Sequence, residues 1–314
     1  MMIRNRSSAL LALLFAACAG DARNAADTTN VSRDSTPAGT TAPSVPSTIA
    51  KADIPGGRLW YEIAGQGEPV ILVHGGNLDA RMWDVQFALL ARTNQVVRYD
   101  LRGFGRSTNA DSAFSAHDDL YALMNALKIP RASIVGLSLG GRVAMDLAVA
   151  HPEMVARLAL AGPGLSGWAW DVREHPDTMW LKAARAAGQR GDTAAVGLAW
   201  LESDFMRPSM EQAALQPQLR ALSTANVRLW SRFLRGADAE IPANPGAFAK
   251  VGALKVPTLL IVGSRDVPEI HRIVDSLAVK IPGARRVAIE GAGHMVNMER
   301  PVQFNEALLA FLKQ

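Results

Sequence analysis

Short apolar-rich runs alternate with segments of helical spacing along most of the chain. The runs predict strands at 59–64, 69–73, 96–100, 132–135, 157–161, 257–262 and 285–289. Segments with apolar residues at helical spacing lie at 80–91, 115–127 and 301–312, and another begins after Ser138. Because strands and helices alternate, the pattern predicts an α/β fold with a doubly wound, mostly parallel sheet. In such folds the ligand site lies at the carboxyl ends of the strands.

The alternation stops between residues 165 and 245, where helix-like segments follow one another without strands. These segments are 177–187, 192–205, one that opens with the capping-box pattern from Ser209 to Gln212, and 225–234. Apolar runs resume at 257, so we expect the stretch 165–245 to be a helical insert. The core is then formed by two segments, 53–164 and 246–314.

The first 52 residues are organised differently. Residues 1–17 combine two arginines with a short apolar run, which is the layout of a secretory signal. Residues 19–52 contain no aromatic residue and are mainly Ala, Thr, Ser, Pro, Asp and Asn. Such a segment cannot bury enough apolar surface to offset the entropy of ordering. We therefore expect a signal peptide at 1–17 and a disordered linker at 18–52.

The stretch Phe15-Ala16-Ala17-Cys18 resembles the lipobox of bacterial lipoprotein precursors. In such precursors the cysteine is lipidated and becomes the mature N-terminus. The resemblance implies export across the inner membrane and a lipid anchor on Cys18, which would make the protein a periplasmic or cell-envelope lipoprotein attached to a membrane. Leucine is the usual residue at the position of Phe15, so cleavage without lipidation is the alternative.

Charge and cysteine content narrow the possible functions. The formal net charge is +4 in 314 residues, without a dense Lys/Arg stripe, so we expect no nucleic-acid partner. Cys18 is the one cysteine of the chain, which excludes an intramolecular disulfide framework and a multi-cysteine metal site. Neither H-E-x-x-H nor G-x-x-x-x-G-K-[ST] occurs, and the chemistry proposed below requires no metal or cofactor.

The stretch Gly136-Leu137-Ser138-Leu139-Gly140 is a candidate nucleophile turn. It follows the apolar run 132–135 and leads into a helical segment. A serine at the apex of a strand–turn–helix adopts a strained backbone conformation, which only very small neighbours tolerate. The hydroxyl then lies beside a helix N-terminus, whose free N–H groups favour developing negative charge. The pattern therefore predicts that Ser138 is a nucleophile.

From about residue 58 to the C-terminus the chain resembles the α/β-hydrolase family. The resemblance rests on the turn around Ser138 and on the stretch from Asp100 to Ser107, which is similar to the family's D-x-R-G-x-G-x-S turn. We expect Asp100 and Arg102 to be structural in that turn. The resemblance implies the α/β-hydrolase fold, and it implies that the insert 165–245 is the helical cap that many members carry over the active site.

His294 and Asp266 complete a candidate catalytic triad. A serine hydroxyl needs a base within hydrogen-bond reach, and the base needs a third group that orients it. Among the six histidines, only His294 lies on a glycine-flanked loop after a late strand. Asp266 directly follows a strand. Three rival acids lie in the insert or within a helix, namely Asp171, Asp238 and Asp275. The chain order Ser138, Asp266, His294 is that of the family's triad.

The resemblance also implies an oxyanion hole formed by the backbone N–H groups of Gly76 and Leu139. We expect aromatic and thioether side chains of the insert to line an apolar acyl or aryl pocket above it. The candidates are Trp168, Trp170, Met179, Trp180, Trp200, Met206 and Trp230. The alternative is that the tryptophans only pack the helices of the insert against one another.

The leading hypothesis is hydrolysis of a small to medium carboxylic ester or lactone through an acyl-enzyme. Serine at position 138 argues against family branches whose nucleophile is a carboxylate. His74 is followed by Gly-Gly-Asn-Leu rather than Gly-x-Gly-Pro-Gly, which makes a carbon–carbon bond hydrolase a weaker alternative. A cofactor-free perhydrolase on the same fold is another. Outside the enzymes, the alternative is a tethered ligand-binding module.

Overall fold

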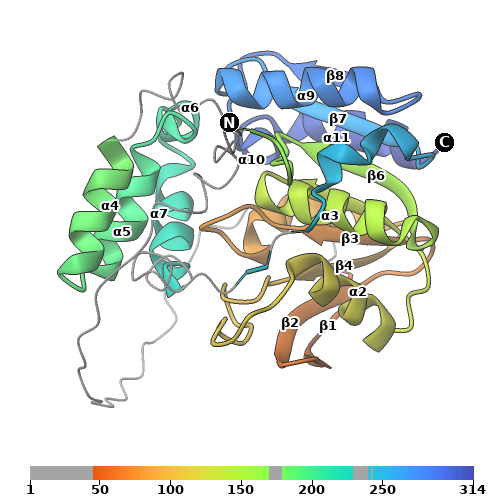
Figure 1. Ribbon diagram of the computed structural model, residues 1–314, viewed down its shortest axis with the longest axis horizontal. Helices are drawn as coiled ribbons and strands as arrows, with labels where there is room; N and C mark the ends of the chain where they lie inside the picture. The colour runs from red at the N-terminus through yellow and green to blue at the C-terminus, as the bar shows by residue number, and fades with distance from the viewer. Residues whose placement is uncertain (1–44, 170–178, 229–239, 242) are drawn as a thin grey trace, which may run out of the picture.

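An eight-stranded sheet forms the centre of the molecule. The computed structural model describes residues 45–169, 179–228, 240–241 and 243–314 (Figure 1). The strands are β1 Ser47–Ile54, β2 Gly57–Ala64, β3 Pro69–Val73, β4 Gln95–Tyr99, β5 Ala132–Leu137, β6 Val155–Ala161, β7 Thr258–Gly263 and β8 Arg285–Ile289. Their spatial order is β1-β2-β4-β3-β5-β6-β7-β8. The pairs β1–β2 and β2–β4 are antiparallel and all others are parallel. The predicted mostly parallel sheet is confirmed.

Helices of the core cover both faces of this sheet (Figure 1). They are α1 Asp84–Leu90, α2 Ala116–Ala126, α3 Leu139–Ala150, α9 Pro268–Lys280, α10 Val296–Glu299 and α11 Pro301–Leu312. Leu120 of α2, Val143 of α3 and Ile270 of α9 belong to one buried apolar cluster. Phe87 of α1 and Phe304 of α11 belong to the other. The two clusters lie on opposite faces of the sheet, which is the doubly wound arrangement.

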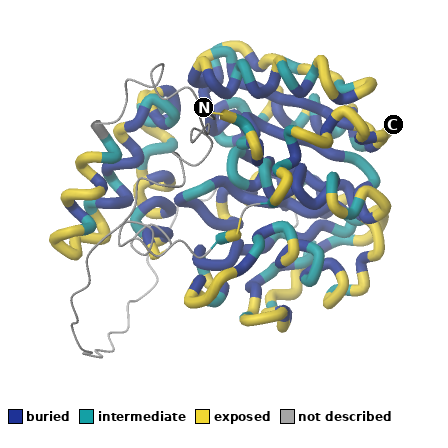
Figure 2. The backbone as a smooth tube through the Cα atoms, viewed as in Figure 1, coloured by how far each residue is buried: buried dark blue, intermediate teal, exposed yellow. Residues whose placement is uncertain are grey.

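The register of the parallel strands brings four loops together at one edge. Val73 is paired with Gly136, Leu137 with Ala161, and Ala161 with Ile261. The residues that follow β3, β5, β6 and β7 therefore lie side by side at the carboxyl edge of the sheet. In Figure 2 the central strands are buried, and the exposed backbone lies on the outer helices and loops.

The insert forms a separate group of helices beside this edge (Figure 1). Its described helices are α4 Met179–Gln189, α5 Thr193–Leu201, α6 Arg207–Met210 and α7 Gln216–Ala225. A small apolar cluster of its own includes Ala184 and Val196. Trp200, Met206 and Leu219 instead extend the core cluster that contains Phe304. The insert is thus packed on the core through buried apolar side chains.

The predicted linker 18–52 is wrong at its C-terminal end, because Ser47–Ile54 is strand β1. β1 pairs with β2 over its whole length, from Ser47 opposite Ala64 to Ile54 opposite Gly57. Most of its side chains are exposed, since it is an edge strand held mainly by backbone hydrogen bonds. Its composition therefore resembles that of a linker, and the sheet domain begins before the predicted residue 53.

Some predicted helices differ from the structure at their ends. The segment 80–91 begins as a 3₁₀ turn, Ala80–Trp83, before α1. The segment 192–205 ends as α5 at Leu201. The capping-box prediction at Ser209 is wrong, because its hydroxyl donates a hydrogen bond to Glu299 instead of capping a helix. The predicted helix 225–234 lies largely outside the described residues, as do residues 177 and 178 of the segment 177–187.

The predicted signal peptide 1–17 and the lipidation site Cys18 lie outside the described residues. Within the described part of the chain, no helix combines the length and the apolar content that crossing a membrane requires.

Candidate active site

Ser138 occupies a strained turn between β5 and α3. Its φ is 53° and its ψ is −114°, a conformation that costs energy for any residue with a side chain. The turn is held from both sides, because the Ser138 N–H donates to the Ala161 carbonyl at 2.9 Å and the Ser138 carbonyl accepts from Gly164 N–H at 2.9 Å. The side chain is only partly buried. The turn therefore holds a hydroxyl at the carboxyl edge of the sheet, as the sequence predicts.

Two glycines make this turn possible. A Cβ atom at Gly136 would lie 2.3 Å from the carbonyl oxygen of Gly140. A Cβ atom at Gly140 would lie 2.1 Å from the carbonyl oxygen of Val73. Both separations are too short for any side chain, so the spacing around Ser138 follows from the close approach of α3 to β3 and β5.

Asp266 and His294 form a buried pair. Nδ1 of His294 lies 3.0 Å from Oδ1 and 2.9 Å from Oδ2 of Asp266. The exposed fractions of the two residues are 2% for His294 and 8% for Asp266. The Val267 N–H donates to Oδ1 of Asp266 at 2.8 Å. With Nδ1 donating to the carboxylate, Nε2 of His294 is left as the proton acceptor. This is the arrangement of a general base with its orienting acid.

The loop after β6 connects this pair to the serine turn. A Cβ atom at Gly162 would lie 3.0 Å from Oδ2 of Asp266 and 3.1 Å from Nδ1 of His294. Two residues later, Gly164 donates to the Ser138 carbonyl. In the described contacts the Ser138 hydroxyl has no hydrogen bond to His294. Catalytic hydrogen bonds are often long before substrate binds, so this does not argue against the pairing.

The two candidate oxyanion residues lie together. A Cβ atom at Gly76 would lie 4.0 Å from Cβ of Leu139, and one at Gly75 would lie 3.7 Å from Cβ of Ser138. The turn after β3 therefore packs directly on the start of α3. Leu139 is the first residue of that helix, where backbone N–H groups have no partner within the helix.

His74 holds the same turn in place and does not act as a base. Its Nε2 accepts from Leu101 N–H at 2.9 Å, so its Nδ1 carries the proton and donates to the Gly75 carbonyl at 2.7 Å. Burial lowers the pKa of His74, against the opposite effect of Asp100. A neutral imidazole therefore ties the turn after β3 to the turn after β4.

Asp100 and Arg102 have the structural role that the sequence predicts. Asp100 accepts from Ala80 N–H at 2.9 Å and from Arg106 N–H at 2.8 Å. Arg102 donates to both oxygens of Asp119, at 2.8 and 2.7 Å. Both residues are almost fully buried. Their side chains are occupied by the turns they hold.

The predicted pocket residues have different surroundings. Trp200 and Met206 are buried in the apolar cluster shared with the core. Trp168 donates from its indole N–H to Glu269 and packs on Phe248. Trp180 lies partly buried against both the insert's own cluster and the cluster shared with the core. Trp170, Trp230 and the side chain of Met179 lie outside the described residues.

Three residues of the site were not predicted. Phe205 of the insert places its ring edge-on to the His294 imidazole, with the ring centroids 4.9 Å apart. Glu299 lies beneath the His294 loop and accepts from Gly293 N–H at 2.6 Å. Asn226 joins the insert to the turn after β3. None of the three lies in a local motif, since each becomes part of the site only through contacts between distant segments.

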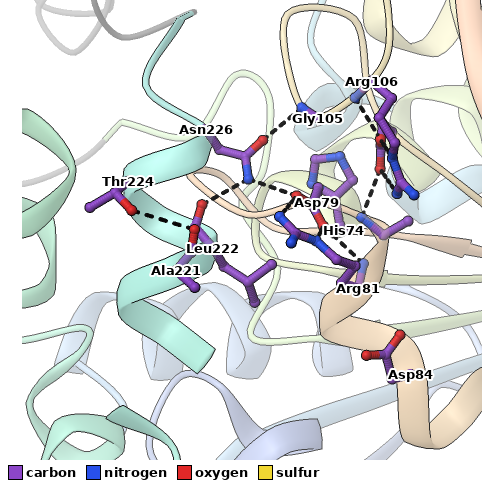
Figure 3. A network of polar contacts seen from close by, with 12 residues as sticks. His74, Asp79, Arg81, Asp84, Gly105, Arg106, Ala221, Leu222, Thr224 and Asn226 are labelled. Carbon is purple, nitrogen blue, oxygen red and sulfur yellow. Dashed lines mark hydrogen bonds and ion pairs between the residues drawn. The ribbon is translucent and has the colours of Figure 1, made fainter. Parts of the chain in front are cut away.

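Figure 3 shows the network around Asn226. Its side-chain amide donates to Oδ2 of Asp79 at 2.9 Å and accepts from Gly105 N–H at 2.6 Å. Arg81 donates to both oxygens of Asp79, at 2.9 and 2.7 Å. Burial alone would raise the pKa of Asp79, but the hydrogen bonds from Arg81 and Asn226 outweigh it and hold the pKa at about 2. The insert is therefore tied to the loop that carries Gly76.

The described residues contain no group of three or more His, Cys, Asp and Glu side chains arranged to hold a metal ion. The groups that the structure brings to the carboxyl edge of the sheet are a hydroxyl, a buried imidazole–carboxylate pair and backbone N–H groups. Together these groups are suited to nucleophilic attack by serine and to stabilising the resulting oxyanion.

Comparison with known proteins identifies relatives of this chain. A family model described as the alpha/beta hydrolase family matches residues 70–307. The pimeloyl-acyl-carrier protein methyl ester esterase of Nitrosomonas europaea is 27% identical over 267 residues, which cover 78% of this chain and 96% of that protein. The crystal structure of the enol-lactonase from Burkholderia xenovorans LB400 has a TM-score of 0.68 and 26% identity, and the match covers 84% of this chain and 100% of the other.

One relative carries a different kind of name. The dihydrolipoyllysine-residue acetyltransferase component of the acetoin cleaving system of Pseudomonas putida is 30% identical over 282 residues. The match covers 84% of this chain and 69% of that protein. The relatives therefore carry names of different activities, although each of them matches most of this chain.

Proposed function

The chain belongs to the alpha/beta hydrolase family and is an enzyme of that family, and we propose that it hydrolyses small to medium carboxylic esters or lactones through an acyl-enzyme on Ser138. The observation that carries the proposal is the buried His294–Asp266 pair, with an Nδ1-to-Oδ2 distance of 2.9 Å. The loop after β6 touches this pair and also holds the Ser138 turn. The esterase and the lactonase among the compared proteins support acyl hydrolysis as the reaction class.

The proposed reaction has two halves. In the first, Nε2 of His294 takes the proton of Ser138 while Oγ attacks the substrate carbonyl, and the N–H groups of Gly76 and Leu139 hold the oxyanion. When the carbonyl re-forms, the alcohol leaves and receives the proton from His294. In the second half, His294 takes a proton from water as the water oxygen attacks the acyl carbonyl. The bond between the acyl carbon and Ser138 Oγ then breaks, the carboxylic acid leaves, and Oγ takes the proton back from His294. Asp266 stabilises the protonated imidazole in both halves.

The proposed substrates are neutral or singly charged. The insert contributes apolar residues such as Trp200 and Met206, which are buried against the core. A carbon–carbon bond hydrolase would use the same serine and histidine on a vinylogous diketone. A perhydrolase would use the same acyl-enzyme with peroxide in place of water.

A substrate screen tests the proposal. Purified wild type and the Ser138→Ala variant are assayed on esters, lactones, amides and vinylogous diketones, with and without hydrogen peroxide. Turnover of an ester or lactone by wild type, lost in the variant, supports the proposal. Turnover of diketones alone favours the carbon–carbon alternative, and peracid formation favours the perhydrolase. No turnover by a folded wild type that still binds one of these compounds indicates a ligand-binding module.

We further propose that Cys18 is the lipidated N-terminus of the mature protein. The proposal rests on the two arginines, the short apolar run and the single cysteine next to small residues. Two or three acyl chains would anchor the protein stably, because each buried methylene contributes about 0.8 kcal/mol. We expect the Cys18→Ser variant to move from the membrane fraction to the soluble fraction. Mass spectrometry that finds an unmodified mature N-terminus at residue 19 or later contradicts the proposal.

A further inference from the structure

Glu299 is a buried carboxylate directly beneath the loop of His294. It is the last residue of α10, and 4% of its surface is exposed. Its Oε2 accepts from Gly293 N–H at 2.6 Å, and its Oε1 accepts from Met295 N–H at 3.1 Å. The two donors flank His294 in the chain. One carboxylate therefore fixes the backbone on both sides of the candidate base.

The third partner of this carboxylate comes from the helical insert. The hydroxyl of Ser209, which is fully buried, donates to Oε1 of Glu299 at 2.6 Å. The neighbouring Pro208 packs so closely on the loop that a Cβ atom at Gly293 would lie 2.5 Å from its Cβ. Phe205, from the same segment, contacts the imidazole ring itself. The segment 205–209 of the insert thus contacts both the ring of His294 and the group that holds its loop.

Among the described residues no cation is paired with the carboxylate of Glu299, since the adjacent Arg300 donates to the backbone carbonyl of Glu299 instead, at 2.9 Å. In the part of the chain that the structure describes, its side chain is bonded to two backbone N–H groups and one hydroxyl, and forms no ion pair. A buried carboxylate without a cation depends on every donor it has. We therefore expect loss of the Ser209 hydroxyl to change the length or direction of the two backbone hydrogen bonds to Glu299 that flank His294.

We infer that Glu299 is a positioning residue for His294, and that the insert controls this positioning through the hydroxyl of Ser209. The inference rests on the proposed role of His294 as the general base. It adds a function to the insert that does not depend on lining a substrate pocket. The insert, packed on the core, completes the set of donors around Glu299 and so sets the position of the imidazole.

Two substitutions test the inference through kinetics. Glu299→Gln preserves the shape but turns one acceptor into an NH₂ donor that faces another donor. We expect kcat to fall about ten- to hundred-fold while KM changes less than about three-fold, because a small displacement of a catalytic group is costly. Ser209→Ala removes only the donor of the insert, and we expect a fall in kcat of about three- to ten-fold. The double variant should lose less than the product of the two effects, because both changes act on one network.

Matched controls separate positioning from general packing. Ser223→Ala removes another buried hydroxyl of the insert, which donates to the Gly197 carbonyl at 2.7 Å within the insert itself. Glu62→Gln neutralises another largely buried carboxylate, which bonds Arg98 in the sheet far from the loop. We expect both controls to keep the wild-type kcat.

A second readout does not require turnover. In a Ser138→Ala background, we expect the proton NMR signal of the His294 Nδ1–H to shift or broaden on adding Glu299→Gln or Ser209→Ala, and to stay unchanged on adding Ser223→Ala. A folded Glu299→Gln enzyme with a kcat within two-fold of wild type and an unshifted signal overturns the inference. If Glu299→Gln does not fold, the Ser209→Ala variant is judged by its kcat and by the position of its Nδ1–H signal in the same way. Activity that survives in Ser138→Ala would overturn the proposed function instead. The NMR comparison would still decide whether Glu299 and Ser209 position the imidazole of His294.

Discussion

The sheet core and the helical insert contact the candidate site in different ways. The core supplies Ser138, Gly162 and Asp266 from the ends of neighbouring strands, whose register places them side by side. The insert supplies no residue of the triad. It reaches the same loops through single buried side chains, namely Ser209 and Asn226. We therefore propose that the core carries out the chemistry and that the insert adjusts the positions of the core loops.

The two polar contacts of the insert also differ from each other. Asn226 bonds Asp79, whose carboxylate is paired with Arg81 and whose pKa is held at about 2. Ser209 bonds Glu299, whose other partners are backbone N–H groups on either side of His294. We therefore expect the first contact to contribute stability near neutral pH that is lost in acid, and the second to govern the position of the base.

The largest effects should come from the core. In the proposed mechanism the serine, the base and the orienting acid act as one unit. We therefore expect Ser138→Ala or His294→Ala to lower kcat by about a million-fold, and Asp266→Asn by about ten-thousand-fold. Steady-state kinetics on the best substrate of the screen measures these losses, and circular dichroism checks the fold. A Ser138→Ala enzyme that keeps more than a few per cent of wild-type activity would contradict the assignment.

The contact between the insert and Asp79 should affect stability more than chemistry. A shift of the pKa from 3.8 to about 2, at about 1.4 kcal/mol per unit, corresponds to about 2.5 kcal/mol of stabilisation. We expect Asp79→Asn to lose about this much free energy of unfolding at pH 7. Because the folded-state pKa is the lower one, the contribution is complete above about pH 5 and is lost as the pH falls through about 4 toward 2.

Urea unfolding at several pH values measures the difference in free energy of unfolding between wild type and Asp79→Asn. The gap between wild type and Asp79→Asn should be constant from pH 7 to about pH 5 and should close between about pH 4 and pH 2. Asp84→Asn is a suitable control, because that carboxylate belongs to the same part of the chain and is about half exposed. A gap for Asp79→Asn that does not change with pH would mean that ionisation of Asp79 is not what stabilises this contact.

Features that depend on strand periodicity and short motifs could be predicted from the sequence. The parallel strands from β3 to β8, the turn at Ser138 and the helix Pro301–Leu312 follow from local apolar patterns. Asp266 and His294 could be selected because each follows a strand that ends at the same edge. Their hydrogen bond confirms that the two loops meet.

Other features depend on contacts between distant segments and leave no local pattern. Strand β1 lies at the sheet edge with mostly exposed side chains, so its composition matches that of a linker. The residues around Ser209 predict that it caps a helix. Its hydroxyl instead donates a hydrogen bond to Glu299, which lies ninety residues further along the chain. Asn226 and Asp79 meet across an even longer separation.

The smallest effects should come from the aromatic residues of the insert. Trp200 is buried in the apolar cluster shared with the core, whereas Trp180 is only partly buried, against both that cluster and the insert's own. We expect Trp200→Ala to move the preferred acyl length on p-nitrophenyl esters, with changes in kcat/KM of up to about ten-fold per methylene, and the partly buried Trp180, when replaced by alanine, to move it less. If neither variant moves the optimum while both stay folded, the tryptophans only pack the insert.

Covalent labelling tests the central assignment most directly. The wild-type protein is treated with a serine-directed fluorophosphonate, and the adduct is located by peptide mass spectrometry. We predict a single adduct on Ser138, no adduct in Ser138→Ala, and labelling slowed by several orders of magnitude in His294→Ala, because the base activates the hydroxyl. An unlabelled wild type, or an adduct on another residue that persists in Ser138→Ala, would contradict the assignment of Ser138 as the nucleophile.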